Sequence, residues 1–322
     1  MKAVRVHAYG GPDVLTYEGV STPEPAAGEA RIRIEAIGVN FVDVYYRTGK
    51  YPSALPMIPG MEAAGVVEAV SQAHPDVVPG ARVAFAMHLG SYAEFVVLPV
   101  DRLVPIPDDV PATLAAASLL QGMTAQFLGT DLGPERSGEP VLVHAAAGGL
   151  GQLLVQVLKK RGMQVLGTAS TSEKRDLAAS LGADLMIDYT RDGWADEVMR
   201  FTDGRGVAVV YDSVGAATWK QSFDCVRSRG SVVFCGQSSG MVPPIDPQLL
   251  RQRGSVSMSR PSLTHYIADR RELLDRVEKV YDAVRRGELR VRIEDHLPLK
   301  DAAQGHVLLE SRTVTGKIIL SP

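Results

Sequence analysis

The chain has 322 residues, 45% of them hydrophobic, which is enough for a sizeable core and long for one compact domain, so we expect two domains. Its formal net charge of −3 at pH 7 does not favour a nucleic-acid partner or an anionic membrane surface, and we expect neither nucleic-acid binding nor membrane insertion. The two cysteines, Cys225 and Cys235, and a start without an apolar leader favour a cytoplasmic location.

Short strands separated by proline and glycine dominate the chain up to residue 111. The segment 30–37 shows the pattern best, because alanine and isoleucine alternate there with arginine and glutamate. Further segments with strand character are Met1–Val6, Ala64–Ala69, Arg82–Ala86, Ala93–Val97 and Leu103–Pro105. Many short strands with such breaks predict a compact, partly open β-barrel.

From residue 112 the pattern changes to an alternation of strands and helices, after a helical segment at Ala112–Leu128. The expected strands are Val141–His144, Gln164–Thr168, Asp184–Ile187, Val207–Tyr211, Ser231–Cys235 and Ser255–Met258. The expected helices between them are Gln152–Arg161, Ser172–Ser180, Trp194–Phe201, Ala216–Val226 and Asp246–Arg253. Six strands with intervening helices predict an α/β domain with a doubly wound, six-stranded parallel sheet of Rossmann type.

The last part of the chain combines a long charged helix with a short tail. Apolar residues form one stripe along Asp269–Arg286, which we interpret as a surface helix whose stripe faces the core. A helix near Lys300–Ser311 and a strand at Gly316–Leu320 follow. These elements are too few for a core of their own. We therefore expect residues 263–322 to return to the first domain, 1–121, with the Rossmann domain at 122–262.

A glycine-rich turn follows the first expected Rossmann strand. Residues 141–155 combine an apolar strand, a loop of alanine and glycine and an amphipathic helix, and the loop fits the dinucleotide pattern as Ala146-x-Gly148-x-x-Gly151. Small residues let the backbone approach a pyrophosphate, and the helix N-terminus offers N–H donors. The motif alone is also compatible with a turn whose residues are small only so that a strand and a helix can pack closely. Its place in a Rossmann unit favours cofactor binding.

The end of the second Rossmann strand indicates which dinucleotide binds. NAD sites carry a carboxylate there for the ribose 2′-hydroxyl, whereas this chain has hydroxyl residues, Ser170 among them, followed by Lys174. These groups suit a 2′-phosphate. The alternative is that Lys174 is only a solvated residue of the helix's first turn, and the neighbouring acid Glu173 leaves that alternative open. We expect NADPH as the cofactor.

Six stretches, in order along nearly the whole chain, carry a wider resemblance. They are Gly38–Gly49, Pro59–Val67, His144–Gly151, Val210–Gly215, Ser259–Leu263 and Glu310–Arg312. In these stretches the sequence resembles the zinc-independent quinone oxidoreductases of the ζ-crystallin type, in the medium-chain dehydrogenase/reductase superfamily. The resemblance implies a GroES-like catalytic domain, a Rossmann domain, a homodimer and NADPH-dependent reduction of a quinone in the cleft between the domains.

The resemblance also implies a site without metal. Zinc-dependent relatives carry cysteine and histidine where this chain has Asn40-Phe41 and Met61, so the ligand types for a catalytic zinc ion are missing. A quinone stabilises its reduced anion by delocalisation and needs less help from a Lewis acid than an aldehyde does.

The expected catalytic residues follow from family position. Asn40, Asp43 and Tyr45 are placed beside the nicotinamide and the quinone, where they would orient the reactants or supply a proton. Gln121 and Thr124 are placed near the nicotinamide, and the role of the uncharged Gln121 stays open. For Asn40 and Asp43 the alternative is an ordinary turn after the strand at 30–37.

The expected cofactor contacts extend over several loops. The loop residues for the pyrophosphate are Ala147, Gly148, Gly149, Leu150 and Gly151. The residues for the adenosine side are Ser170, Lys174, Tyr189 and Ser213, and Arg312 adds positive charge near the phosphate. The residues for the ribose and nicotinamide end are Asn40, Tyr45, Thr124, Cys235, Gly236, Gln237 and Arg260. Tyr189 is also compatible with a surface tyrosine, Arg260 with a structural salt bridge, and Cys235 with contact through its backbone rather than its thiol.

Two other functions stay open. The same scaffold and cofactor would serve reduction of an α,β-unsaturated carbonyl, an enone or enoyl compound, which also needs hydride transfer without zinc. A non-enzymatic protein that binds NADPH, with a structural or RNA-binding role as in some crystallin relatives, is the alternative from another class. The acidic net charge argues against RNA.

Overall fold

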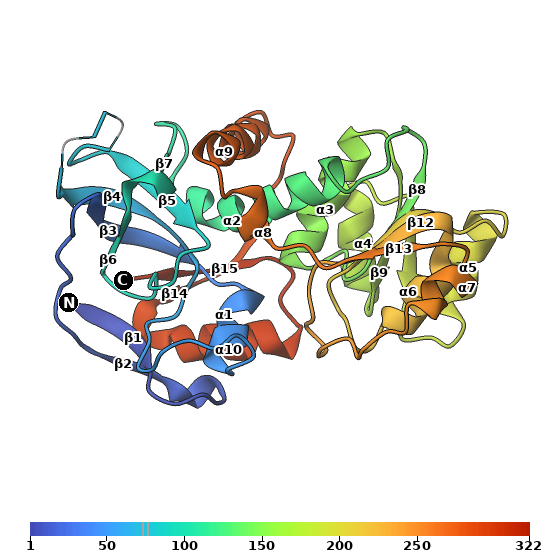
Figure 1. Cartoon of the computed structure of the whole chain (residues 1–322), viewed down its shortest axis with the longest axis horizontal. Coiled ribbons are helices and arrows are strands. Elements are labelled where there is room, and N and C mark those ends of the chain that lie inside the picture. Colours follow the sequence, from blue (N-terminus) through green and yellow to red (C-terminus); the bar gives the residue numbers. More distant parts are fainter. Residues whose placement is uncertain (73, 76) are drawn as a thin grey trace. The chain divides into compact units, whose positions relative to one another are not determined.

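The computed structural model describes residues 1–72, 74–75 and 77–322, and the chain forms two compact units (Figure 1). The first unit contains Met1–Met123 and Ile267–Pro322, and the second contains Thr124–Tyr266. The boundaries expected from the sequence, 121/122 and 262/263, lie two and four residues from these. No helix among the described residues is long and apolar enough to cross a membrane.

A seven-stranded sheet forms the centre of the first unit, with the order β14-β15-β3-β4-β5-β7 and with β6 paired to β3. A separate hairpin pairs β1 with β2. The strands are β1 (Lys2–Val6), β2 (Leu15–Gly19), β3 (Glu29–Gly38), β4 (Glu62–Val70), β5 (Arg82–Ala86), β6 (Phe95–Pro99), β7 (Val104–Pro105), β14 (Ile293–Pro298) and β15 (Lys317–Ser321). The sequence interpretation missed β2 and β14, and it placed β6 two residues early.

The C-terminal strand lies inside this sheet, between β14 and β3. β15 lies parallel to β14 and antiparallel to β3, and its buried Ile318 and Leu320 join the core formed by β3, β4 and β5. Strand β3 contributes Ile32 and Ile34 to the same core from the face that its alternation predicts, and it contributes Ile37 beyond a register shift in its pairing with β4. The tail of the chain is therefore part of the first unit's central sheet.

Helices complete the first unit. They are α1 (Phe41–Arg47), the first part of α2 (Ala112–Thr130), α9 (Arg270–Arg285), α10 (Ala302–Ser311) and 3-10 turns at Pro12–Val14, Val100–Arg102 and Leu299–Asp301. Asp269 caps α9 by accepting N–H bonds from Arg271 and Glu272, and the predicted stripe is buried at Leu273 and Val277. The alternative of an ordinary turn at Asn40–Tyr45 is wrong, because Asn40 is the N-cap of α1.

The second unit is a six-stranded parallel sheet with helices packed against it. The strand order is β10-β9-β8-β11-β12-β13, which is the order of the Rossmann fold. The strands are β8 (Pro140–Val143), β9 (Gln164–Ala169), β10 (Leu185–Asp188), β11 (Val207–Asp212), β12 (Val226–Phe234) and β13 (Ser257–Ser259). The helices are the end of α2, then α3 (Gly149–Lys160), α4 (Ser172–Ser180), α5 (Trp194–Phe201), α6 (Trp219–Cys225), α7 (Gln248–Gln252) and α8 (Leu263–Tyr266).

Three elements of this unit have bounds that differ from the sequence interpretation in ways that matter for a site. Helix α3 begins at Gly149 and not at Gln152, so the last glycines of the motif belong to its first turn. Strand β12 begins at Val226 and not at Ser231, and α6 is shorter than predicted at both ends. The predicted bounds of α4 and α5 are correct.

Candidate functional site

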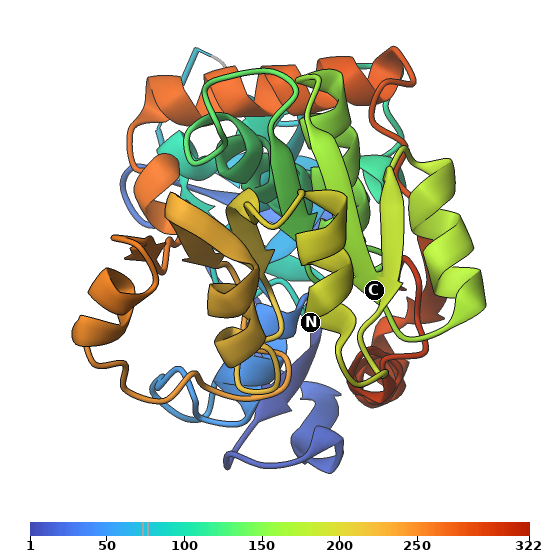
Figure 2. The ribbon, with the colours of Figure 1, turned by 90° about the vertical axis from the view of Figure 1, so that its right-hand side faces the viewer.

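The residues expected to bind the cofactor in the second unit follow the carboxyl ends of its strands. All neighbouring strands run parallel, so these ends lie at one edge of the sheet, seen side by side in Figure 2. Ligands bind at this edge in doubly wound folds. The residues are Ala147–Gly151 after β8, Ser170 after β9, Tyr189 after β10, Ser213 after β11, Cys235–Gln237 after β12 and Arg260 after β13.

The loop between β8 and α3 is shaped for close approach by its glycines. Gly148 is the N-cap of α3 in an extended conformation, and no side chain caps the helix. A Cβ atom on Gly151 would lie 2.8 Å from the Cα of Ala146 and would collide with the carbonyl oxygen of Ala145. The N–H groups of a first helical turn have no acceptor inside the helix. The start of α3 therefore offers donors to an anion.

Hydrogen bonds through His144 tie this loop to the loop after β11. The His144 ring is buried, and its two nitrogens lie 3.0 Å from Thr168 Oγ1 and 3.2 Å from Ser222 Oγ. Ser222 donates to Asp212 at 2.8 Å, and the Ser213 hydroxyl donates to the His144 carbonyl at 3.3 Å. Burial lowers the pKa of His144, so the ring is neutral. The network fixes two of the loops that surround the expected cofactor site.

At the expected adenosine end, Lys174 lies in the first turn of α4, where its backbone N–H donates to the Thr171 hydroxyl at 3.3 Å. The next residue, Arg175, pairs with Asp188 at 3.1 Å. Asp188 is an acid at the end of β10 that the sequence interpretation did not consider, and hydrogen bonds from Thr190 lower its pKa. The ring of Tyr189 packs against the core of the unit, so it is held in place rather than projecting freely.

The loops after β11 and β12 lie against each other at the expected nicotinamide end. A Cβ atom on Gly236 would lie 2.5 Å from the carbonyl oxygen of Ser213, so the contact needs glycine. The Cys235 N–H donates to the Asp212 carbonyl at 2.8 Å, and burial raises the pKa of the Cys235 thiol to about 12. A thiol in that state is a poor nucleophile. Arg260 donates to the Phe234 carbonyl at 3.1 Å.

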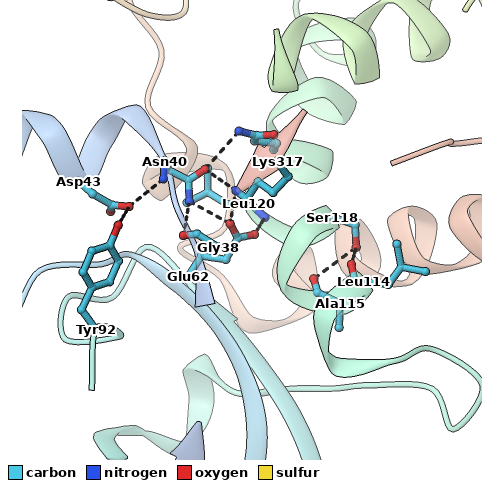
Figure 3. Close-up of polar contacts among 11 residues, drawn as sticks. Gly38, Asn40, Asp43, Glu62, Tyr92, Leu114, Ala115, Ser118, Leu120 and Lys317 are labelled. Atoms are coloured by element: carbon cyan, nitrogen blue, oxygen red, sulfur yellow. Dashed lines mark hydrogen bonds and ion pairs between the residues drawn. The ribbon is translucent and has the colours of Figure 1, made fainter. Parts of the chain in front are cut away.

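The first unit contains a buried polar cluster at the start of α1 (Figure 3). Asn40 and Asp43 form a capping box, in which the Asn40 N–H donates to Asp43 Oδ2 at 2.8 Å. The Asn40 amide donates to Glu62 Oε2 at 2.9 Å, and its oxygen accepts from the Lys317 ammonium at 2.7 Å. Lys317 and Glu62 form an ion pair at 2.6 Å, with side chains 2% and 0% exposed. Three elements distant in sequence, α1, β4 and β15, meet here.

Gln121 belongs to this cluster and is half-buried, unlike its neighbours. Its amide donates to Asn40 Oδ1 at 3.4 Å. One residue earlier in α2, the Leu120 N–H donates to Glu62 Oε1 at 2.5 Å. The structure thus brings the predicted residues Asn40, Asp43 and Gln121 together.

A second chain of hydrogen bonds starts at Asp43. Tyr92 donates to Asp43 Oδ2 at 3.2 Å, and His306 Nε2 lies 2.9 Å from the Tyr92 hydroxyl. Arg47 donates to His306 Nδ1 at 3.1 Å and pairs with Glu310 at 2.7 Å. Because arginine can only donate, His306 carries its proton on Nε2 and donates it to Tyr92. Burial lowers the pKa of His306 to about 3, so the ring is neutral.

Asp43 itself is fully buried, and burial raises its pKa to about 7. Oδ2 accepts both of the hydrogen bonds described above. Oδ1 has no hydrogen-bond partner within the described part of the chain. A proton bound by Asp43 therefore belongs on Oδ1.

Tyr45 lies on α1 among other aromatic rings and is 6% exposed. Its ring meets Tyr51 edge to face with 5.3 Å between centroids and lies 6.5 Å from the ring of Phe41. The ring of Tyr46 meets Tyr51 in the same way at 5.7 Å. The Lys50 ammonium lies 5.6 Å from the Tyr45 centroid. This cluster offers flat apolar surfaces together with hydroxyl groups.

Two more predicted residues lie on or next to helices. Thr124 is the first residue of the second unit, on α2. Arg312 follows α10 in the first unit, in a left-handed conformation with φ of 59°.

Sequence reasoning missed five buried residues of the networks around Asn40 and Asp43: Arg47, Glu62, Tyr92, His306 and Lys317. Glu62 and Lys317 each stand at the first position of a strand whose next residues are apolar. A charge at a strand end is common in exposed positions, so the sequence alone gave no reason to pair them.

Two family models match the chain: "Alcohol dehydrogenase GroES-like domain" over residues 26–108 and "Zinc-binding dehydrogenase" over residues 149–279. The quinone oxidoreductase of Pseudomonas aeruginosa is 42% identical over 100% of this chain and 99% of its own length. This chain belongs to the quinone oxidoreductase family of medium-chain dehydrogenases/reductases. The predicted GroES-like and Rossmann folds are thereby confirmed.

Two further members of the family bear on function. The quinone oxidoreductase of Escherichia coli, solved in complex with NADPH, is 36% identical and matches 100% of both chains with a TM-score of 0.96. The 2-haloacrylate reductase of a Burkholderia species is 38% identical over 99% of this chain and 98% of its own length.

One of the matching models is named for zinc, but the residues of this quinone oxidoreductase family member do not fit a catalytic zinc ion. Such sites use cysteine, histidine or carboxylate ligands. Among the described residues, no three or more of these lie close enough together to hold a metal. Asn40 is the position at which the sequence predicts that a zinc ligand is missing. Its amide oxygen accepts a hydrogen bond from Lys317.

Proposed function

We propose that this chain is an NADPH-dependent quinone reductase that transfers hydride or electrons to a quinone without a protein-bound metal. The observation that carries the proposal is the match along the whole chain to quinone oxidoreductases, one of them solved with NADPH. The glycine-rich loop and the uncapped start of α3 support it, because they fit a dinucleotide pyrophosphate.

The residues of the second unit have separate roles in holding NADPH. The first turn of α3 binds the pyrophosphate, and the packed loops after β11 and β12 hold the ribose and nicotinamide end through their backbones. Ser170 and Lys174 bind the 2′-phosphate, with Tyr189 beside them. NADPH supplies the hydride when bound.

In the first unit, some of the predicted residues contact the quinone and others support them. Asn40 and Asp43 are 3% and 0% exposed and form hydrogen bonds with other residues of the protein, so they support the site without contacting the quinone. Gln121, which is half-buried, and Tyr45, whose ring lies in the aromatic cluster of α1, contact the quinone. The Tyr45 hydroxyl and the Gln121 amide can each donate a hydrogen bond to a quinone oxygen as it gains charge.

The alternative enzyme reaction is reduction of an activated carbon–carbon double bond, favoured by the similarity to the Burkholderia 2-haloacrylate reductase. Steady-state rates with NADPH and 1,4-benzoquinone, 9,10-phenanthrenequinone, an enone and 2-chloroacrylate separate the two. We expect kcat/KM for a quinone to exceed that for either alkene by tenfold or more. Turnover of the alkenes alone would refute quinone reduction, and binding of NADPH without any turnover would favour the non-enzymatic alternative.

We also propose a cytoplasmic homodimer, as the sequence suggests. Light scattering on the purified chain measures the stoichiometry directly, and a monomer at micromolar concentration would contradict it.

A further inference from the structure

We propose that Lys317 is a positioning residue for this reaction: its buried ammonium fixes the Asn40 amide, which in turn orients Gln121 toward the substrate. The inference rests on the proposed function for its substrate and on the geometry of the first unit for its mechanism. Lys317 begins the last strand, 277 residues away from Asn40 in the sequence.

The charges around Asn40 leave its amide one orientation. The Lys317 ammonium can only donate and the Glu62 carboxylate can only accept. The Asn40 oxygen must therefore face Lys317, at 2.7 Å, and its nitrogen must face Glu62, at 2.9 Å. The same nitrogen donates to the Gly38 carbonyl at 3.0 Å. An ion pair thus determines the direction of a neutral side chain.

The fixed Asn40 amide in turn orients the Gln121 amide. Asn40 Oδ1 accepts both from Lys317 and from Gln121, so the Gln121 nitrogen, and not its oxygen, is turned toward Asn40. The same ion pair anchors the helix that carries Gln121, because Glu62 Oε1 accepts the N–H of Leu120. The ion pair between Lys317 and Glu62 therefore positions both the backbone of α2 and the Gln121 amide.

The packing around Gly38 shows how closely the elements converge. A Cβ atom on Gly38 would lie 2.7 Å from the Ala116 carbonyl of α2 and 2.8 Å from the Lys317 side chain. Only glycine leaves room there for α2 and β15 to meet β3. The ammonium is thus held by packing as well as by its two hydrogen bonds.

Among the members of this cluster, Gln121 has access to solvent while Asn40, Glu62 and Lys317 are buried. One Gln121 amide hydrogen is committed to Asn40, and the amide has a second N–H with which to donate to a quinone oxygen. Lys317 itself cannot reach a substrate. It acts by holding the donor in place, and small misplacements of a reacting or orienting group cost up to about 100-fold in rate.

The competing explanation is that the ion pair only joins β15 to the rest of the sheet. Lys317→Met removes the charge at similar length and leaves Glu62 uncompensated, so its thermal midpoint should fall well below that of the wild type. The double variant Lys317→Met/Glu62→Gln removes both charges, so its thermal midpoint should return toward that of the wild type. Lys279→Met, in an exposed pair with Asp275 on α9, is the matched control.

We expect the double variant to fold and to keep its NADPH dissociation constant within about twofold, with kcat for 1,4-benzoquinone lowered tenfold or more. Asn40→Ala, which leaves the ion pair intact and breaks the link to Gln121, should lower kcat to the same extent. Recovery of kcat together with stability in the double variant, or wild-type kcat in Asn40→Ala, would overturn the proposal.

A crystal structure of the double variant or of Asn40→Ala distinguishes failure of this inference from failure of the proposed function. If the wild type reduces no quinone, the proposed quinone reduction is wrong. The conformation of the Gln121 side chain in the variants still tests the positioning role. We expect its amide to adopt a new rotamer or become disordered. An unchanged Gln121 amide in the variants would overturn the inference whatever the activity.

Discussion

At the scale of single residues, Asp43 and His306 are buried titratable groups whose charged forms the fold suppresses. Burial raises the pKa of Asp43 to about 7, so the folded state binds its proton from about pH 4 to about pH 7, where the unfolded chain does not. Stability from this group therefore falls as the pH rises through that window. Burial lowers the pKa of His306 to about 3, so its contribution to stability rises between about pH 3 and about pH 6.5.

The two slopes oppose each other in the wild type, and single substitutions should reveal them. Relative to the wild type, Asp43→Asn should gain stability as the pH rises from about 4 to about 6.5, by up to about 1.4 kcal/mol per pH unit. His306→Gln should lose stability over the same interval by a similar amount. Urea unfolding at several pH values measures both. Parallel curves for the two variants and the wild type would contradict the assigned protonation states.

We propose that the choice of NADPH over NADH depends on Lys174. Lys174→Ala removes the cation proposed for the 2′-phosphate, and a charge-assisted hydrogen bond contributes about 1.5–3 kcal/mol. We expect KM for NADPH to rise by about tenfold or more while KM for NADH changes little. Lys160→Ala, at the opposite end of α3, serves as a control. An equal rise of KM for both cofactors would remove the proposed contact.

At the scale of elements, the glycines of the β8–α3 loop set the distance between helix and loop. Their spacing in the sequence predicted the motif, but the structure shows which glycine is sterically required. Gly151 lies in the first turn of α3 directly against the Ala145 carbonyl, so any Cβ atom there must displace the helix start. The N–H groups that would bind the pyrophosphate move with it.

Gly151→Ala should therefore weaken NADPH binding more than it weakens the fold. We expect a loss of about 1–3 kcal/mol in stability from overpacking and an increase of tenfold or more in the NADPH dissociation constant. Gly19→Ala is the matched control, because a Cβ atom on Gly19 of β2 has nothing within 4 Å. Calorimetric titration and thermal unfolding give the two quantities. A Gly151→Ala protein that binds NADPH like the wild type would show that the loop tolerates the change.

The bounds predicted from the sequence are correct where local chemistry sets the end of an element. The bounds of α4 were predicted correctly, and Thr171 caps that helix. Strand β14 was missed because its residues show no clear alternation, and its pairing with β15 depends on a distant part of the chain. Helix α1 was missed because the capping box of Asn40 and Asp43 was interpreted only as a possible turn.

At the scale of the whole molecule, the chain leaves its first unit after Met123 and returns to it from Ile267. The return places β15 in the central sheet beside β3, and with it Lys317 beside Asn40. A variant that alters the last strand therefore acts on the residues around α1. This is why the Lys317 experiment compares stability, cofactor binding and turnover in the same proteins.

The sequence by itself determined the Rossmann order of strands and helices, the glycine-rich loop, the expectation of NADPH as the cofactor, and the family. These features depend on neighbouring residues and on local spacing, which a linear pattern records. Only the tertiary structure decided that Asn40 and Asp43 are buried, that Glu62 and Lys317 bind Asn40, and that Tyr92, itself hydrogen-bonded to His306, binds Asp43. Those contacts join residues up to 277 positions apart, and burial, which fixes their charges and directions, exists only once the chain has folded.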